Sequence, residues 1–146
     1  MLAETEVRPS YVFSPNPALK GYYPKWVDNL AENATLEGSM LDGVVQGAEN
    51  VRSVVTTIRS LYDRQAHKFA DHVGSCFFLE EYVAEVRGEA LGCIVLVSYN
   101  EDGQTDRVIA GYRPRTALTN FARLLGEKFA GTPIAKHFTE STNEGR

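Results

Sequence analysis

The sequence predicts an α+β domain in which helices pack on one face of a curved antiparallel sheet. Two observations carry this prediction. Apolar residues recur at helical spacing over 47–62, and a series of strand-like segments follows over 67–113, separated only by short turns. Consecutive strands joined by turns form an antiparallel meander, and an amphipathic helix must bury its apolar side against such a sheet.

The length and charge of the chain limit the domain count and the partners. The 146 residues fit one domain, with an extended arm over 1–17, the domain over 18–138 and a flexible tail over 139–146. A formal charge of −4 argues against nucleic acid or an anionic membrane as the main partner. No apolar run is long enough to span a bilayer and no signal-peptide pattern is present, so we expect a cytoplasmic protein.

Two cysteines and three histidines show no zinc-binding spacing, so we expect neither a metal nor another cofactor. Cys76 and Cys93 each lie in an apolar stretch, which predicts buried free thiols.

The N-terminal region combines proline-rich and apolar segments. Pro9, Pro15 and Pro17 exclude a long helix, which is why an extended arm is expected. Pro24 is placed to begin a short helix over 25–31. The apolar residues of that helix share one face: Trp26, Val27 and Leu30.

A hairpin and a helix follow. Two short strands over 35–41 and 44–46 are joined at Asp42-Gly43, because both residue types tolerate the positive φ of a tight turn. Gly47 then begins the helix. Its apolar stripe consists of Val51, Val54, Val55, Ile58, Leu61 and Tyr62.

Four further strands and a second helix complete the pattern. The strands are expected over 67–73, 76–87, 92–99 and 107–113, with a turn at 100–103 between the last two. A helix follows from about Thr116 to Ala130. Its buried stripe consists of Leu118, Phe121, Leu124, Leu125 and Phe129.

Three segments, WVDNLAENATLEG, VVQGAENVRSVVTTI and YNEDGQTDRVIAGYRP, resemble the SnoaL-like branch of the nuclear transport factor 2-like superfamily. The resemblance covers roughly residues 18 to 131. It implies a cystatin-like, cone-shaped sheet with helices packed on its concave face around a pocket. Members of the superfamily include ketosteroid isomerases, polyketide cyclases and dehydratases, and others that only bind partners, so the fold does not decide the function.

The sequence departs from the isomerases of this superfamily at their acids. The resemblance places the isomerase base directly after Glu37, where this chain has Gly38, and the second acid opposite Val95. No trio matches the Asp-Arg-Asp set of limonene epoxide hydrolase. Steroid-type isomerisation by those residues is therefore not expected.

Three other residues are candidates for catalysis. Asp71 shares a predicted strand face with Phe69, and burial in a pocket would raise the pKa of its carboxyl and suit it to proton transfer. His72 points the other way and could also move a proton, although one bulge would exchange the two faces. Tyr82, which shares a face with Glu80, could donate to a developing oxyanion. The structural alternatives are a rim carboxylate, a surface histidine and a core tyrosine.

We therefore expect a pocket that holds a small apolar molecule. The expected lining residues are Trp26, Tyr62, Phe69, Val95, Tyr99 and Tyr112. The alternatives are a cofactor-independent isomerase, cyclase or dehydratase acting on a carbonyl compound, and a non-catalytic dimeric interaction domain. The resemblance, and a sheet whose outer face must be covered, also imply a homodimer.

Overall fold

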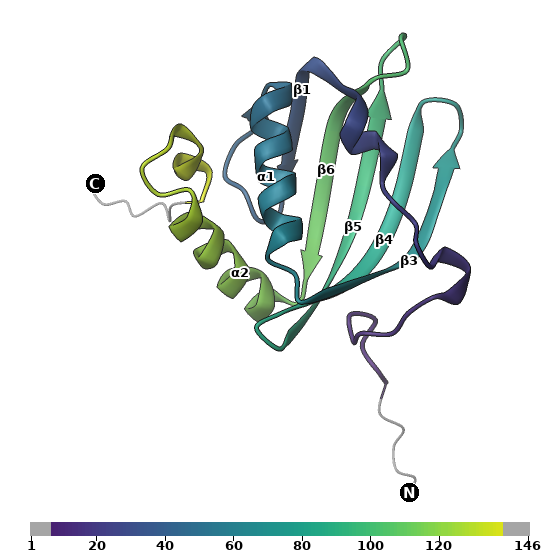
Figure 1. Ribbon diagram of the computed structural model, residues 1–146, viewed down its shortest axis with the longest axis vertical. Coiled ribbons are helices and arrows are strands. Elements are labelled where there is room, and N and C mark those ends of the chain that lie inside the picture. The colour runs from purple at the N-terminus through teal and green to yellow at the C-terminus, as the bar shows by residue number, and fades with distance from the viewer. Residues whose placement is uncertain (1–6, 139–146) are drawn as a thin grey trace, which may run out of the picture.

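Within residues 7–138, which the computed structural model describes, six strands form one curved sheet and two α-helices pack on its concave face (Figure 1). The strand order is β2-β1-β6-β5-β4-β3. The strands are β1 (Leu30–Gly38), β2 (Val45–Gln46), β3 (Arg64–Val73), β4 (Phe77–Val86), β5 (Glu89–Tyr99) and β6 (Thr105–Arg113). The predicted α+β class is confirmed. The predicted tail lies outside the described residues.

Strands β3 to β6 form the antiparallel meander that the sequence predicts. The first strand is different, because β1 lies parallel to β6 and so places the start of the chain beside its last strand. The sheet is thus mostly antiparallel. Strand β1 also begins at Leu30, inside the helix expected over 25–31, and that helix is the shorter 3-10 helix η2 (Lys25–Asn29). Trp26 and Val27 are buried as predicted.

The predicted pairing of β1 with β2 is confirmed by the register Thr35↔Gln46 and Leu36↔Val45. The connection is longer than a two-residue turn, since β1 ends at Gly38 and β2 begins at Val45. Gly43 within it has the positive φ of +73° that favours glycine.

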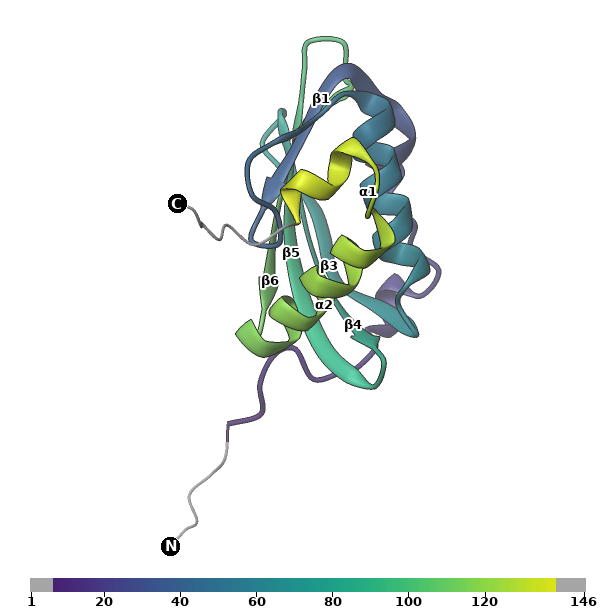
Figure 2. The same ribbon diagram turned by 90° about the vertical axis from the view of Figure 1, so that its left-hand side faces the viewer.

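Helix α1 (Ala48–Ser60) begins directly after Gly47, and Val51, Val54, Val55 and Ile58 are its buried residues. Helix α2 (Arg115–Lys128) begins after Pro114 and lies beside α1 over the same face of the sheet (Figure 2). The chain then folds back in the 3-10 helix η3 (Pro133–His137). Phe138 stacks on Phe129 with ring centroids 5.7 Å apart, which closes one end of the core.

The N-terminal segment over residues 7–16 has a turn at 10–12, where the Val12 N–H donates to the Pro9 carbonyl, and is bound to the sheet. The amine of Lys68 on β3 donates to the carbonyl and the hydroxyl of Ser14, and the amide of Asn16 donates to the Lys68 carbonyl. The next residues form the 3-10 helix η1 (Pro17–Leu19). From there the chain crosses to η2 and places Tyr22 over the inner face of β4, where its hydroxyl reaches Glu80.

Candidate functional site

A cavity lies between the inner face of the sheet, helix α1 and the 3-10 helix η2. Its lining residues are mostly apolar: Pro24, Trp26, Val27, Leu36, Glu37, Gly38, Met40, Leu41, Val55, Ile58, Arg59, Gln65, His67, Glu80, Tyr82, Val95, Val108, Ala110, Tyr112 and Phe138. Its accessible space is about 50 Å³. A water needs about 10–15 Å³ by this measure, so the cavity has room for a ligand of a few heavy atoms.

Strand β4 contributes the carboxylate in the cavity wall. Glu80 and Tyr82 are two residues apart and therefore face the same side of the strand. The Glu80 side chain is 1% exposed. Burial raises the pKa of its carboxyl. Three neighbours partly oppose that rise: the Tyr22 hydroxyl, which donates a hydrogen bond to the carboxylate (3.0 Å), the nearby Trp26 indole and the positive charge of Arg59. The Trp26 Nε1 nevertheless meets no acceptor at hydrogen-bond geometry.

Strand β3 contributes His67 beside this carboxylate. Its ring is 8% exposed and lies between Tyr22 and Tyr82, with ring centroids 4.7 Å and 5.3 Å away. Burial, with the positive charge of Arg59, lowers the pKa of His67 to about 4, so the ring is neutral at neutral pH. Its buried Nε2 has no hydrogen-bond partner. A ligand in the cavity could supply one.

Three tyrosine hydroxyls form a hydrogen-bonded chain behind the cavity. The Tyr82 hydroxyl lies 2.6 Å from that of Tyr62 and 3.3 Å from that of Tyr112. Burial raises the pKa of all three phenols, so each keeps its proton. Two hydrogen bonds use two of the three hydroxyl protons, which leaves one for an acceptor outside the trio. Tyr82 and Tyr112 both line the cavity and can present that proton to a ligand.

The positions of the isomerase acids carry no acid here, and the structure gives a physical reason at one of them. A Cβ added at Gly38 would lie 2.0 Å from the carbonyl oxygen of Ala110 on β6. Because β1 and β6 run side by side there, this position excludes any side chain. Val95 is buried and lines the cavity, as expected of an apolar wall residue.

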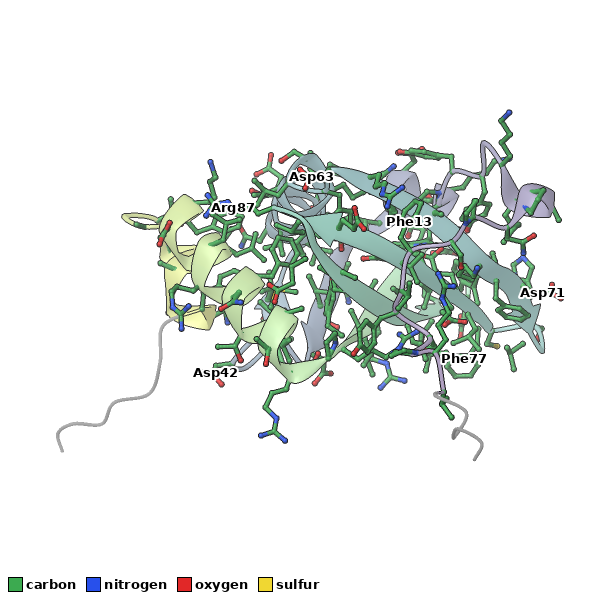
Figure 3. All side chains as sticks on the ribbon, turned by 90° about the horizontal axis from the view of Figure 1, so that it is seen from below. Phe13, Asp42, Asp63, Asp71, Phe77 and Arg87 are labelled. Carbon is green, nitrogen blue, oxygen red and sulfur yellow. The ribbon has the colours of Figure 1, made fainter. Side chains whose placement is uncertain are left out.

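Of the three predicted catalytic residues, Tyr82 lines the cavity and Asp71 and His72 do not. A bulge between His67 and Phe69 is the reason. It leaves His67 on the inner face and turns Asp71 to the outer face, where it is exposed, at the end of the sheet far from α2 (Figure 3). Asp71 accepts a hydrogen bond from the backbone N–H of His72 and therefore does not have the apolar surroundings that its proposed role requires. His72 is exposed, with its ring near Phe78.

The predicted lining residues also divide into those that line the cavity and those that do not. Trp26, Val95 and Tyr112 line the cavity. Tyr62 lies behind it and contacts Tyr82, while Tyr99 lines shallower hollows beside His72. The prediction for Phe69 is wrong, because the bulge places this side chain on the outer face of the sheet, where it is 44% exposed.

Sequence reasoning did not select Glu80, His67 or Arg59 for the site. Glu80 had a usable signal, since strand alternation already placed it with Tyr82. His67 had a signal too, since alternation places it on one face with Phe69 and Asp71; the bulge turns those two outward and leaves His67 inward. Arg59 lies in the last turn of α1, where a basic residue is also the ordinary complement of the helix dipole.

Neither cysteine takes part in a disulfide. Cys93 is buried, as predicted, and burial raises the pKa of its thiol to about 12. Cys76 is exposed, contrary to the prediction.

Over residues 7–138 no three His, Cys, Asp or Glu side chains gather closely enough to hold a metal ion. Of the helices in that range, none has the length and apolar character needed to cross a membrane.

The sequence matches no protein-family model and none of the curated proteins. Solved structures show the fold. A steroid delta-isomerase from Pseudomonas aeruginosa is similar, with a TM-score of 0.66 at 19% identity over 71% of this chain and 77% of that one. An uncharacterised protein with a cystatin-like fold from Silicibacter pomeroyi gives a TM-score of 0.67 at 14% identity, over 73% of this chain and 74% of that one.

A nuclear transport factor 2-like protein of unknown function from Burkholderia xenovorans gives a TM-score of 0.52 at 10% identity, over 62% of this chain and 73% of that one. Together these similarities confirm the nuclear transport factor 2-like, cystatin-like fold that the sequence resemblance implied. At these identities they establish the fold alone.

Proposed function

We propose that the protein binds a small, mostly apolar molecule in the cavity between α1 and the sheet. The observation that carries the proposal is the buried Nε2 of His67, which has no partner and belongs to a side chain that lines a mostly apolar cavity. A buried polar atom without a partner costs about 1–3 kcal/mol, and a ligand with one hydrogen-bonding group would remove that cost. The free hydroxyl proton of the tyrosine chain provides a second contact for an acceptor such as a carbonyl oxygen.

The size of the cavity limits the ligand. Drug-sized molecules occupy pockets of about 300–1,000 Å³, whereas the accessible space here is about 50 Å³. The structural similarity to a steroid delta-isomerase supports an apolar ligand with a carbonyl group. A steroid would exceed this space, and Gly38 and Val95 stand in place of the isomerase acids.

The test is a thermal-shift screen of small cyclic and aromatic ketones, alcohols and acids. A ligand that binds the native state raises the melting temperature by mass action. Val95→Phe adds bulk inside the cavity and should abolish the shifts. Ile94→Phe adds similar bulk on the outer face of the same strand and should leave them unchanged. Equal shifts in both variants would refute binding in the cavity.

Proton transfer on a carbonyl compound is a second candidate, favoured by the burial of Glu80 beside Tyr82. A carboxylate with a raised pKa is a stronger base, and a tyrosine hydroxyl can donate to the enolate oxygen that forms when the α-proton leaves. Glu80 would take that proton, exchange it with solvent, and deliver a solvent-derived proton to carbon.

Deuterium exchange into the α-position of cyclohexanone in D₂O, followed by NMR, tests this activity. Glu80→Gln should reduce the exchange rate to that of buffer, while the exposed Asp71→Asn should keep the wild-type rate. A wild-type protein that adds nothing to the buffer rate would contradict the catalytic candidate and leave the binding proposal standing.

A further inference from the structure

A surface hollow adjoins the polar end of the cavity. Its lining residues are Tyr23, Val27, Asp28, Arg52, Thr56, Arg59, Ser60 and Gln65. Val27, Arg59 and Gln65 also line the cavity, so these three side chains separate the enclosed space from the surface. Val27 is buried, while Arg59 and Gln65 are half-buried. A ligand that enters from this hollow, which we call the mouth, would pass these three side chains to reach the cavity.

Within residues 7–138, Arg59 stands at this mouth without an ion-pair partner. Its guanidinium lies over the ring of Tyr23, 5.0 Å from the ring centroid. A contact with the face of an aromatic ring does not supply a hydrogen-bond acceptor in the plane of the guanidinium, where its five N–H donors lie. Among the described residues Arg59 forms no ion pair and donates no hydrogen bond. Arg52 adds a second positive charge two helical turns earlier in α1, at the outer rim of the hollow.

The field of Arg59 extends into the cavity. It helps to lower the pKa of His67 and favours the ionised form of Glu80. Acidic side chains also line the hollow and the cavity. Asp28, in the hollow, accepts a hydrogen bond from Tyr23, and burial works against ionisation of Glu80.

We propose that the ligand is a small carboxylic acid with an apolar chain, whose carboxylate is held by Arg59 at the mouth and whose chain enters the cavity. This inference rests on the proposed function, since it takes the cavity as the binding site. A guanidinium matches the two oxygens of a carboxylate with parallel N–H donors, which selects a planar anion over an alcohol or an amine. An accessible space of about 50 Å³ suits a chain of a few carbons.

The test is titration of the full-length protein with hexanoate, 1-hexanol and hexylamine, which share one chain and differ in the head group. Chemical shifts in ¹⁵N spectra report binding to each. Hexanoate should bind at least about tenfold more tightly than hexanol, in keeping with a charge-assisted contact, and hexylamine should bind more weakly than both. Arg59→Gln should remove the preference for hexanoate over hexanol.

Two further variants keep the result interpretable. Arg59→Lys retains the charge without the two parallel donors and should keep part of the preference. Arg123→Gln removes an equal charge from α2, away from the mouth, and should keep the full preference for hexanoate. Equal affinity for hexanoate and hexanol, or an unchanged preference in Arg59→Gln, would overturn the inference and leave binding in the cavity intact. Failure of all three probes to bind would refute the inference together with the proposed function.

Discussion

At the scale of single residues, burial has opposite effects on the two titratable groups in the cavity wall. The pKa of His67 is lowered to about 4, so between that value and its ordinary value of 6.5 the unfolded chain binds more protons than the folded one. The pKa of Glu80 is raised above 4.5, so at pH values just above 4.5 the folded chain binds more protons than the unfolded one. The His67 contribution to stability is therefore lost as pH falls, and the Glu80 contribution as pH rises.

We predict that His67→Gln flattens the acid side of the stability profile. In the wild type, the free energy of unfolding should fall as pH drops from about 6.5 to 4. After allowance for screening by water, His67 accounts for roughly 2 kcal/mol of that fall. Urea denaturation at several pH values measures it. The same decrease in His67→Gln would contradict the assignment, and His72→Gln is the control, because that ring is exposed.

The contrast between Tyr82 and Asp71 shows what strand alternation can predict. Alternation along β4 is regular, and it placed Tyr82 and Glu80 on the inner face as the structure has them. In β3 the bulge next to His67 reverses the alternation, and nothing in the local sequence marks it. The site is therefore predictable where a strand is regular and paired on both sides, as β4 is, and not in an edge strand with a bulge.

At the scale of elements, the parallel contact between β1 and β6 sets what the cavity can contain. Gly38 pairs with Ala110, and no Cβ fits between them. The glycine at the isomerase-base position is thus required by backbone packing. An acid could not be accommodated there by substitution without separating the two strands.

We predict that Gly38→Ala destabilises the protein by about 1–3 kcal/mol, the usual cost of forcing extra atoms into a packed interior. Gly111→Ala is a matched control in β6, because a Cβ at that position meets no atom within 4 Å. Thermal denaturation compares the two variants. Equal melting temperatures for Gly38→Ala and Gly111→Ala would show that β1 can shift away from β6 at little cost.

The helices and the meander were predictable because their signals are local. The stripes of α1 and α2 repeat at helical spacing, and the meander strands are followed by turns that contain Gly74, Gly88 or Gly103, or by Pro114. The parallel pairing of β1 was not predictable, since it joins Leu36 to Val108 across most of the chain. The start of β1 was missed for the same reason: Leu30 pairs with Thr105, which overrides the short helix favoured locally.

At the scale of the whole molecule, the outer face of the sheet exposes apolar side chains that no element of the described structure covers. Phe69, Val73, Phe77 and Ile94 are 44%, 50%, 36% and 46% exposed. Strand alternation and register add Leu79 and Leu96 between them, since this pair is adjacent across β4 and β5. Contiguous apolar surface of this kind usually marks an interface.

We propose a second copy of the chain as the partner for this face. A two-fold axis running along the strands between β4 and β5 would place Leu79 over Leu96 of the second copy. It would also bring β3 over the second copy's β6, with Asp71 beside Arg107. Both charges lie on the outer face and neither is held in an ion pair within the described residues. The patch is therefore complementary to itself, as an isologous interface requires.

Light scattering at micromolar concentration should therefore give twice the 16.2 kDa mass of the chain. Ile94→Lys places a charge at the centre of the patch and should yield monomers, because an unpaired charge is costly to bury. Val7→Lys changes an apolar residue that is 88% exposed on the N-terminal arm and should leave the dimer intact. A wild-type mass of one chain at these concentrations would refute the dimer, and equal dissociation in both variants would exclude this face as its interface.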